Sequence, residues 1–335
     1  MVVKQATPKT LGRAVAVSAA ALLFVLVAAP LIGSTSIDLR QAFTADSTDR
    51  VILFSARLPR VLLAMLAGGS LAVAGLLFQA LLRDSLATPD ILGVSSGASL
   101  GAVVAICAGL QLVAHLPAIW VAAFAGAALA LLAVVAVASE GRRMSSFTLL
   151  LSGVTMNSVC LAVILFLQNV ASFTQSVAIT RWLMGSIEAV EYRTLLWLSV
   201  AVAPPLALIF WRASDWNLLA VGEEWAASHG VNVQWLMRAG FLAGSALTGA
   251  VTTLTGPIGF VGLIVPHALR MRLGADHRLL IPCSFLVGAA FLTLCDTLAR
   301  VILAPTEVPV GVITALVGGP FFIWLLRSRR RSLWL

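Results

Sequence analysis

Lysine is nearly absent from this chain: only Lys4 and Lys9 occur among its 335 residues. A phosphate-binding loop for ATP requires the pattern G-x-x-x-x-G-K-[ST], and neither lysine lies in one. The chain therefore has no ATPase site of this kind. If ATP drives its activity, the ATP is hydrolysed by a separate subunit.

Charged residues of every kind are also scarce. They make up 11% of the chain, whereas soluble domains have about 25%, and 60% of the residues are hydrophobic. With a mean hydropathy of +1.01, the composition predicts an integral membrane protein. No basic stripe with interleaved aromatic residues occurs, so the net charge of +8 does not indicate nucleic-acid binding.

The chain has four cysteines, all within apolar stretches and at no metal-ligand spacing: Cys107, Cys160, Cys283 and Cys295. Cysteines in such surroundings are usually small core residues. We therefore expect no disulfide, no metal site and no cofactor.

Long apolar stretches are what the chain has in abundance. A helix that crosses a bilayer needs about 20 mostly apolar residues. The first stretch follows basic residues and resembles a signal peptide, but its length favours a retained first helix. We predict one all-α domain over 1–335 with ten crossings, at 14–33, 58–81, 91–112, 117–138, 146–168, 193–211, 235–255, 257–271, 279–302 and 310–326.

An even number of crossings puts both ends of the chain on one side of the membrane. With both ends in the cytoplasm, 15 of the 22 basic residues face the cytoplasm and 7 the outside (22 − 15 = 7). This distribution agrees with the positive-inside rule, and the basic C-terminal sequence R-S-R-R-R supports it. We therefore expect cytoplasmic N- and C-termini.

Two connections are too long for turns between helices, which usually have about 2–8 residues. Residues 169–192 are predicted outside, with a short surface helix and Trp182 at the membrane interface. Residues 212–234 are predicted inside, as two short helices joined at Gly222. An ordinary solvated loop is the simpler interpretation of this second segment, but its length favours a docking element for another protein.

Three arginines are predicted at the outer face, where arginine is generally rare. Arg57 and Arg60 stand at the start of the second crossing, and Arg300 at the end of the ninth. They either extend to lipid phosphates, with Arg300 paired to Asp296, or dock an acidic partner, because guanidinium groups suit carboxylates. Asp296 is predicted inside the membrane, where an unpaired charge costs about 3 kcal/mol, so it should face Arg300 or an interior cavity.

Residues 256–278 interrupt the apolar helical pattern with Pro257 and Pro266, and add His267, Arg270 and His277. In hydrocarbon, helix-breaking residues persist only where neighbouring helices or water satisfy the backbone, so the segment favours a pathway over an anchor. A lone histidine is usually a satisfied core residue, and no second imidazole lies four residues away to complete a metal pair.

Glycines recur at helical spacing, and this pattern predicts close approach of helix backbones. The positions are Gly93, Gly97 and Gly101 in the third crossing, and Gly240 and Gly244 in the seventh. The same region contains Ser96, which with His267 as a base would make an intramembrane protease. The motif is short, so this is a minor alternative.

Several stretches, in order along nearly the whole chain, match the pattern of a known family. They are RLPRVLLAMLAGGSLAVAGLLFQALLRDSLATPDILGVSSGASLGA (57–102), LLLSGVTMN (149–157), RWLMGS (181–186), NLLAVGEEWAASHGVNV (217–233), GPIGFVGLIVPHALR (256–270), GADHRLLIP (274–282) and EVPVGVITALVGGPFFIWLL (307–326). Through them the chain resembles the FecCD family, the membrane permeases of ATP-driven importers for ferric siderophores, haem and cobalamin.

The resemblance implies a type II ABC importer permease in a bacterial inner membrane. It implies a homodimer whose path is lined by the fifth and tenth crossings, two cytoplasmic ATPase subunits, and a periplasmic or lipid-anchored substrate-binding protein. By position, it implies docking of that protein on Arg57, Arg60 and Arg300. It further implies ATPase coupling through Leu218, Gly222, Glu223, Ala226 and Gly230, and a gate or pathway at Ser145, Ser146, Phe147 and Asn157.

We therefore expect a translocation subunit, not an enzyme, that moves a ferric siderophore, or haem or cobalamin, by alternating access. A secondary transporter driven by an ion gradient, with Asp296 as its coupling carboxylate, is the alternative. Two positions depart from the family pattern. The chain has Arg-Asp-Ser-Leu-Ala at 83–87 where Arg-Asn-Pro-Leu-Ala is usual, and His229 where leucine is usual.

Overall fold

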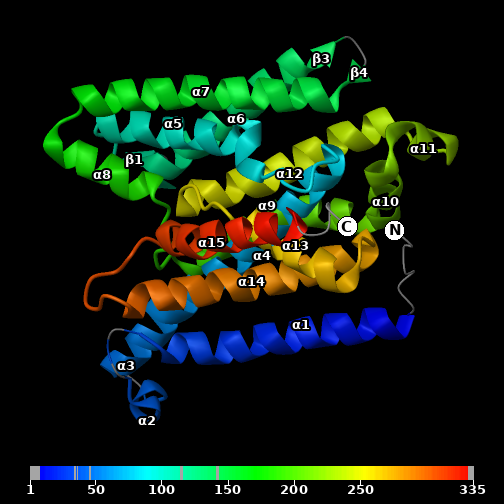
Figure 1. The fold of residues 1–335 in the computed structure, drawn as a ribbon. Helices are drawn as coiled ribbons and strands as arrows, with labels where there is room; N and C mark the ends of the chain where they lie inside the picture. The colour runs from blue at the N-terminus through cyan, green and yellow to red at the C-terminus, as the bar shows by residue number, and fades with distance from the viewer. Residues whose placement is uncertain are drawn as a thin grey trace.

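Each of the ten predicted crossings corresponds to a helix in the computed structural model, which describes residues 8–33, 35, 37–44, 47–113, 116–140 and 143–330 (Figure 1). The predicted all-α membrane fold is thus confirmed. The ten helices are α1 (Pro8–Ala28), α4 (Leu58–Leu81), α5 (Val94–Cys107), α6 (Ala118–Ala138), α7 (Ser146–Val170), α9 (Tyr192–Trp211), α12 (Val233–Thr255), α13 (Val261–Leu273), α14 (His277–Val301) and α15 (Val310–Arg330).

Shorter elements connect these helices. They are η1 (Ala29–Leu31), α2 (Leu39–Ala42), α3 (Thr48–Val51), η2 (Ile52–Arg57), η3 (Pro89–Leu92), α8 (Phe173–Leu183), α10 (Ala213–Val221) and α11 (Glu223–Ser228). Two antiparallel pairs of two-residue strands close turns: β1 (Leu112–Val113) with β2 (Leu116–Pro117), and β3 (Ser139–Glu140) with β4 (Arg143–Met144). The helix α8 and the pair α10–α11 stand where the two long connections were predicted to contain short helices.

Six helical stretches of the described residues are long and apolar enough to cross a bilayer by themselves. The helix α5 is shorter than predicted: it has 14 residues and spans about 21 Å, against a hydrocarbon core of about 30 Å. The predicted span 91–112 is therefore wrong at both ends, because η3 and a turn precede the helix and the chain leaves it at Cys107.

The helix α4 lies at the centre of the bundle (Figure 1), and most of its residues are buried. Small residues permit this position, since a Cβ atom on Gly68 would collide with the backbone of Gly288 in α14. In the same way, Gly75 lies directly against Gly262 of α13. Lipid tails supply no hydrophobic drive between helices, so such close contacts are what hold α4, α13 and α14 together.

The predicted close approach of helix backbones through glycines is confirmed for Gly97 and Gly101. Gly93 also lies close to the backbone of α7, at Gly153, but its predicted place within the helix is wrong. Gly240 and Gly244 of α12 lie against the rings of Trp216 and Phe78 instead of a helix backbone. Gly97 and Gly101 of α5 lie against the backbone of α6 at Gly126 and Ala122. Gly93 precedes α5 and has φ +81°, a left-handed conformation that favours glycine. It reverses the chain between η3 and α5, and does not belong to a helix face.

The predicted break in residues 256–278 lies between α12 and α13. Gly256 and Phe260 have φ of +68° and +69°, so the chain leaves one helix and enters the next through two left-handed residues. Pro257 stands in this break, whereas Pro266 lies within α13 without ending it. Trp182 of α8 packs against the α5–α6 pair beside this region. Its ring is half-buried there, and its place at the membrane interface stays a prediction.

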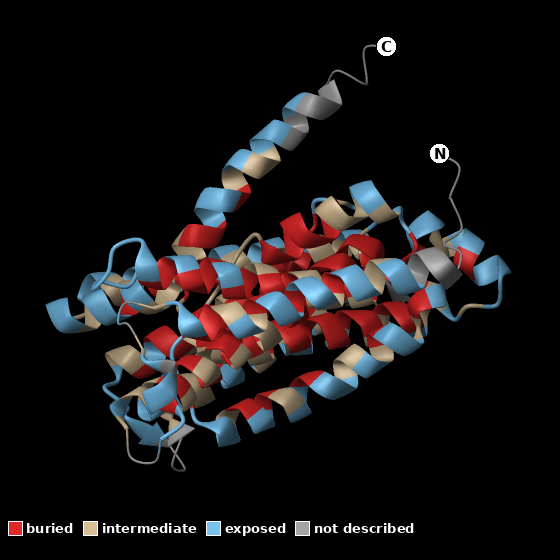
Figure 2. Ribbon diagram, turned by 90° about the horizontal axis from the view of Figure 1, so that it is seen from below, coloured by how far each residue is buried: buried red, intermediate tan, exposed pale blue. Residues whose placement is uncertain are grey.

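The helices α1, α7 and α15 lie at the periphery. The helix α1 packs along α14, and α7 forms the opposite side of the bundle (Figure 1). The helix α15 leaves the bundle at an angle (Figure 2) and exposes Leu316, Val317, Ile323 and Trp324. These exposed apolar faces need lipid or another subunit to cover them.

Candidate functional site

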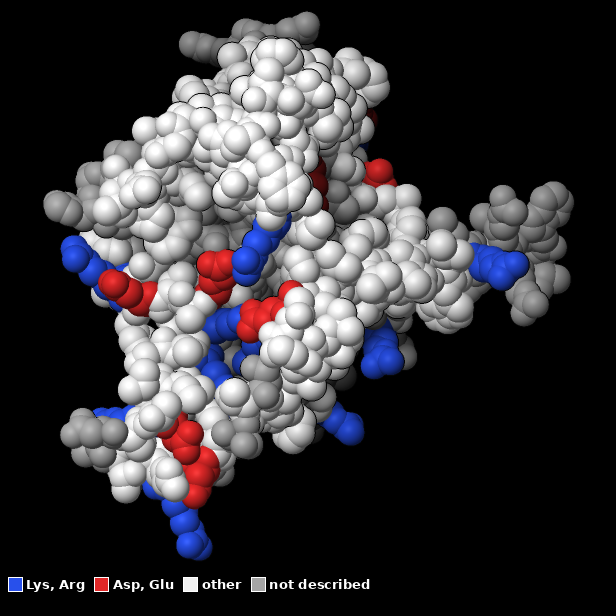
Figure 3. All heavy atoms as spheres, turned by 90° about the vertical axis from the view of Figure 1, so that its left-hand side faces the viewer, with Lys and Arg blue, Asp and Glu red and all other residues white. Residues whose placement is uncertain are grey.

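Charged side chains gather around a hollow on the face at the left of Figure 1 (Figure 3). A group of neighbouring residues on this side, which we name the arginine network, comes from three separate segments: the junction of η2 and α4, the end of α14 and the loop before α15. They are Arg57, Arg60, Asp296, Arg300 and Glu307.

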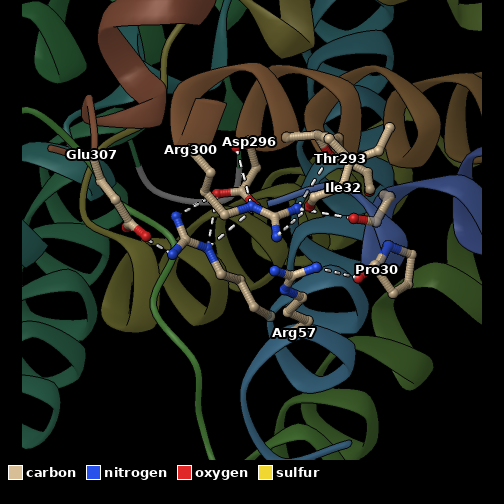
Figure 4. A network of polar contacts seen from close by, with 10 residues as sticks. Pro30, Ile32, Arg57, Thr293, Asp296, Arg300 and Glu307 are labelled. Carbon is tan, nitrogen blue, oxygen red and sulfur yellow. Dashed lines mark hydrogen bonds and ion pairs between the residues drawn. The ribbon is translucent and has the colours of Figure 1, made fainter. Parts of the chain in front are cut away.

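The carboxylate of Asp296 is the hub of this network (Figure 4). Its side chain is 0% exposed. Arg60 donates from Nε and Nη2 to Asp296 Oδ1 at 3.1 and 2.9 Å, and Arg300 Nε lies 3.2 Å from Oδ2. The predicted pairing of Asp296 with Arg300 is confirmed, and the structure adds Arg60 as a second cation.

Glu307 extends the network to the surface. Arg60 Nη1 donates to Glu307 Oε2 at 2.8 Å, and the Glu307 side chain is 46% exposed. Arg60 is therefore held between a buried carboxylate and an exposed one. Both residues also line a cavity of about 30 Å³ together with Arg181 and Glu188.

Arg57 and Arg300 point into the protein. Arg57, which is 6% exposed, donates to the carbonyl oxygens of Pro30 and Leu31 at 3.1 and 3.3 Å. Arg300, which is 4% exposed, donates to those of Ala29 and Ile32. The interpretation that these arginines extend to lipid phosphates is therefore wrong, because each binds backbone carbonyl groups of η1, the turn that follows α1.

The α10–α11 pair lies beyond the other end of α14, since Asn217 of α10 contacts the first residues of that helix. Gly222 joins the two short helices, as predicted. Among the predicted coupling residues, Leu218, Gly222 and Glu223 are half-buried, Ala226 is buried and Gly230 is exposed. Glu223 accepts a hydrogen bond from Arg83 Nη2 at 2.9 Å, and this ion pair ties α11 to the end of α4.

A cavity of about 430 Å³ opens beside this pair, lined by Leu218, His229, Gly230 and Trp235 among others. Arg212 stands at its edge between the rings of Trp211 and Trp235, 4.9 and 4.8 Å from their centroids. His229, the position that departs from the family pattern, packs against Trp225 with ring centroids 4.6 Å apart and the rings tilted by 44°. The aromatic rings thus fix the shape of this end of the molecule.

Asp276 caps the start of α14 by accepting hydrogen bonds from the backbone and side chain of Arg278. Asn217 Nδ2 donates to the same carboxylate at 2.8 Å. Burial by itself would raise the pKa of Asp276, but the hydrogen bonds from Arg278 and Asn217 hold it below its ordinary value. The group is therefore a carboxylate at neutral pH.

The polar residues of the broken segment have partners inside the protein. Arg270 Nη2 donates to Gln79 Oε1 at 2.8 Å, and Gln79 Nε2 donates to the carbonyl oxygen of Gly262 at 3.2 Å. His267 is buried in α13, and His277 Nδ1 lies 2.8 Å from Asn217 Oδ1. Within the ranges that the structure describes, no three metal-ligating side chains come together.

The remaining predicted site residues lie on or beside α7. Ser145 precedes this helix, Ser146 Oγ donates to the carbonyl oxygen of Leu81 at 3.0 Å, and Phe147 is exposed. Asn157 Oδ1 accepts a hydrogen bond from Ser96 Oγ of α5. An asparagine is not a base, so Ser96 is not arranged as an activated nucleophile.

Sequence reasoning missed Glu307, Asn217 and Asp276. Each lies in a stretch that carries the family resemblance (217–233, 274–282 and 307–326), but no local pattern marks the contacts that it makes. The separation of 247 residues between Arg60 and Glu307 shows why spacing could not reveal the pair. The sequence did indicate that Arg60 and Glu307 lie on the same side of the membrane, because Glu307 follows the crossing that ends near Arg300.

Comparison with known proteins places this geometry in a family. The family model described as the FecCD transport family matches residues 21–328. The hemin transport system permease protein of Yersinia pestis is 39% identical over 304 residues, which cover 90% of this chain and 91% of that protein. The cobalamin import system permease protein of Halobacterium salinarum is 42% identical over 292 residues, or 86% and 76% of the two chains.

A solved structure agrees with these relatives. It is described as an inward-facing conformation of a metal-chelate type ABC transporter, with 30% identity and a TM-score of 0.82, and the match covers 95% of this chain and 99% of that one. The similarity therefore extends over all ten crossings.

Proposed function

This chain belongs to the FecCD transport family, and we propose that it imports a large metal chelate as the permease subunit of an ABC transporter. The observation that carries the proposal is the family match over residues 21–328, because it includes both the arginine network and the α10–α11 pair. The chain is a transport permease, and ATP hydrolysis is assigned to a separate subunit.

We place the contact with that ATPase at the α10–α11 pair. The chain has only Lys4 and Lys9 and no phosphate-binding loop, so a separate subunit would hydrolyse ATP. The exposed surface of α11 beside the cavity supports a contact with that subunit here. The cytoplasm is the side of the ATPase, so this placement agrees with cytoplasmic termini and a multi-pass position in a bacterial inner membrane.

We further propose a homodimer with two ATPase subunits and a path between the two copies. The helices α7 and α15 expose long apolar faces, which a second copy would cover. Thr155 and Ser158 on α7 are exposed as well, and hydroxyl groups suit a path better than lipid. Ser145, Ser146 and Phe147, at the start of α7, would then form the gate, with Asn157 farther along it. Membrane lipid would cover the outer faces that the second copy does not.

The arginine network is the proposed contact for the periplasmic or lipid-anchored substrate-binding protein. Because Arg57 and Arg300 are buried, we no longer propose that all three arginines contact this protein directly. Arg60 is the group that an acidic partner would bind, because its present surface partner is the exposed Glu307. Arg57 and Arg300 would hold the end of α1 and Asp296 in place around it.

The substrate class follows from the relatives. Similar permeases are named for hemin and cobalamin, and the similar structure for metal chelates. Haem and cobalamin are therefore the first chelates to test. A ferric siderophore is the further candidate from the family resemblance.

The experiment is uptake into vesicles that contain the chain together with candidate ATPase and binding-protein subunits. We expect ATP-dependent accumulation of one of the three chelates, and none when the ATPase cannot hydrolyse ATP. Accumulation that needs an ion gradient and no ATP would support the secondary transporter instead. That alternative has little support, because Asp296 is already bound by two arginines and leaves no open ligand for a transported ion.

A further inference from the structure

Asn217 joins the α10–α11 pair to one of the long helices of the bundle. Its Oδ1 accepts from the His277 backbone N–H at 2.7 Å and lies 2.8 Å from His277 Nδ1, while its Nδ2 donates to Asp276 at 2.8 Å. Both ends of one amide group are therefore used on the first turn of α14. These contacts cross from residue 217 to residues 276 and 277, so they connect two elements that are distant in the sequence.

The cap of α14 does not need Asn217. Asp276 already accepts the Arg278 backbone N–H at 3.0 Å, as an N-cap residue does, and the Arg278 side chain binds the same carboxylate. The contact from Asn217 is additional to this cap. Its effect is to attach α10 to α14.

The helix α10 is also anchored on its other side. Trp216 is fully buried, donates from Nε1 to the carbonyl oxygen of Ile209 at 3.0 Å, and packs against Gly240 of α12. A short helix held by a buried ring on one side and an amide joint on the other moves together with the helices that hold it. It does not behave as a solvated loop.

The helix α14 carries this attachment to the arginine network. About 19 residues separate His277 from Asp296, a distance of about 29 Å along the helix axis. Between these ends, α14 is fixed to α4 by the contact of Gly288 with Gly68 and of Phe285 with Gly69. Asp296 then binds Arg60 of α4 at the far end.

We propose that Asn217 is the positioning residue that couples the α10–α11 pair to the arginine network through α14. The inference rests on the proposed function, since it needs an ATPase at one end and a binding protein at the other. When the ATPase shifts α10, the three contacts of Asn217 carry the start of α14 with it. The helix transmits this shift to Asp296 and Arg60.

The test is an Asn217→Ala variant of the complete transporter in vesicles, with uptake and ATP hydrolysis measured in the same sample. Asn232→Ala is the matched control. Asn232 stands in the same segment and caps α12 by accepting the Trp235 N–H at 3.1 Å, and within the described part of the chain its side chain makes no hydrogen bond to α14. We expect Asn217→Ala to lower the substrate moved per ATP at least about fivefold and to abolish stimulation of the ATPase by the loaded binding protein. The ATPase subunits should still copurify.

An unchanged ratio of uptake to hydrolysis in Asn217→Ala would overturn the proposal. So would a proportional loss of both activities, equal to that in Asn232→Ala. If the unmodified transporter shows no ATP-dependent uptake, the proposed function has failed, and this result is distinct from either outcome.

A second measurement avoids dependence on the stability of the alanine variant. In the Asn217→Cys, His277→Cys double variant, the joint is lost until a short thiol cross-linker restores it. If α10 and α14 move as one body, cross-linking should recover the lost uptake per ATP. Cross-linking that abolishes the remaining uptake would show that the two helices must move apart, and the proposal would be wrong.

Discussion

Replacing Asp296 by asparagine should destabilise the protein far more than a surface charge change would. The substitution keeps the shape of the side chain and removes the negative charge that Arg60 and Arg300 share. Loss of one partner from a buried ion pair costs about 3–5 kcal/mol. We expect the lower value of about 3 kcal/mol. Arg60 keeps Glu307 at 2.8 Å, and Arg300 keeps the carbonyl oxygens at the end of α1.

The loss can be measured as a shift in thermal unfolding in detergent. Cys160 and Cys283 are free and buried, so a thiol-reactive dye reports their exposure. For 335 residues the unfolding entropy is about 0.7 kcal/mol/K, and a loss of about 3 kcal/mol corresponds to about 4 °C.

Glu307→Gln is the control for this measurement, because the Glu307 side chain is 46% exposed and a surface ion pair contributes at most about 1 kcal/mol. Equal unfolding temperatures for Asp296→Asn and the unmodified protein would refute the idea that Asp296 is the hub of the network. An equally large shift for Glu307→Gln would refute it as well.

Three further predictions concern the other contacts. Glu307→Gln should strengthen binding of the acidic partner about twofold to fivefold, because it frees Arg60. Glu188→Gln, in the same cavity, controls for the general loss of negative charge, and an equal gain there would contradict the specific role. Gly222→Pro should lower uptake while ATP hydrolysis continues, because proline cannot adopt φ 163° or donate the bond from Gly222 N to Leu218 O; normal uptake per ATP would argue against a coupling role. The pKa of Asp276 is lowered in the folded protein, so its stabilising charge is fully present above about pH 4 and is lost as the pH falls through the lower folded value. The difference in unfolding temperature between Asp276→Asn and the unmodified protein should therefore persist at pH 7 and disappear in acid, and a constant difference would contradict this assignment.

The helices could be predicted from the sequence because bilayer thickness sets their length. Apolar stretches of about 20 residues specify a crossing whatever their neighbours are. Where the helix is short, this rule fails. The third crossing was predicted at 91–112, but α5 covers only Val94–Cys107. Apolar residues continue on both sides of α5, and hydropathy cannot distinguish the buried turn of η3 from the helix that follows it.

The charged contacts were harder to predict, since tertiary packing decides them. Arg300 and Asp296 stand four residues apart on one helix, and this local spacing allowed their pairing to be predicted. Arg60 reaches the same carboxylate from 236 residues away, and no sequence pattern connects the two. The burial of Arg57 could not be foreseen either, because its partners are backbone carbonyl groups that every residue has.

The two ends of the bundle differ in how firmly they are held, and this difference indicates where movement begins. At the arginine network, the Asp296 carboxylate is 0% exposed and is held by two arginines, so separating it from them is costly. At the other end, α11 is tied to α4 by the ion pair of Arg83 with Glu223, whose side chains are 41% and 34% exposed. Such a pair contributes about 0–1 kcal/mol, so α11 can shift at little cost. Trp216 and Asn217 anchor α10 to the bundle, so a displacement of α11 is resisted by α10, on the other side of Gly222. The displacement is then transmitted to the bundle helices that hold α10.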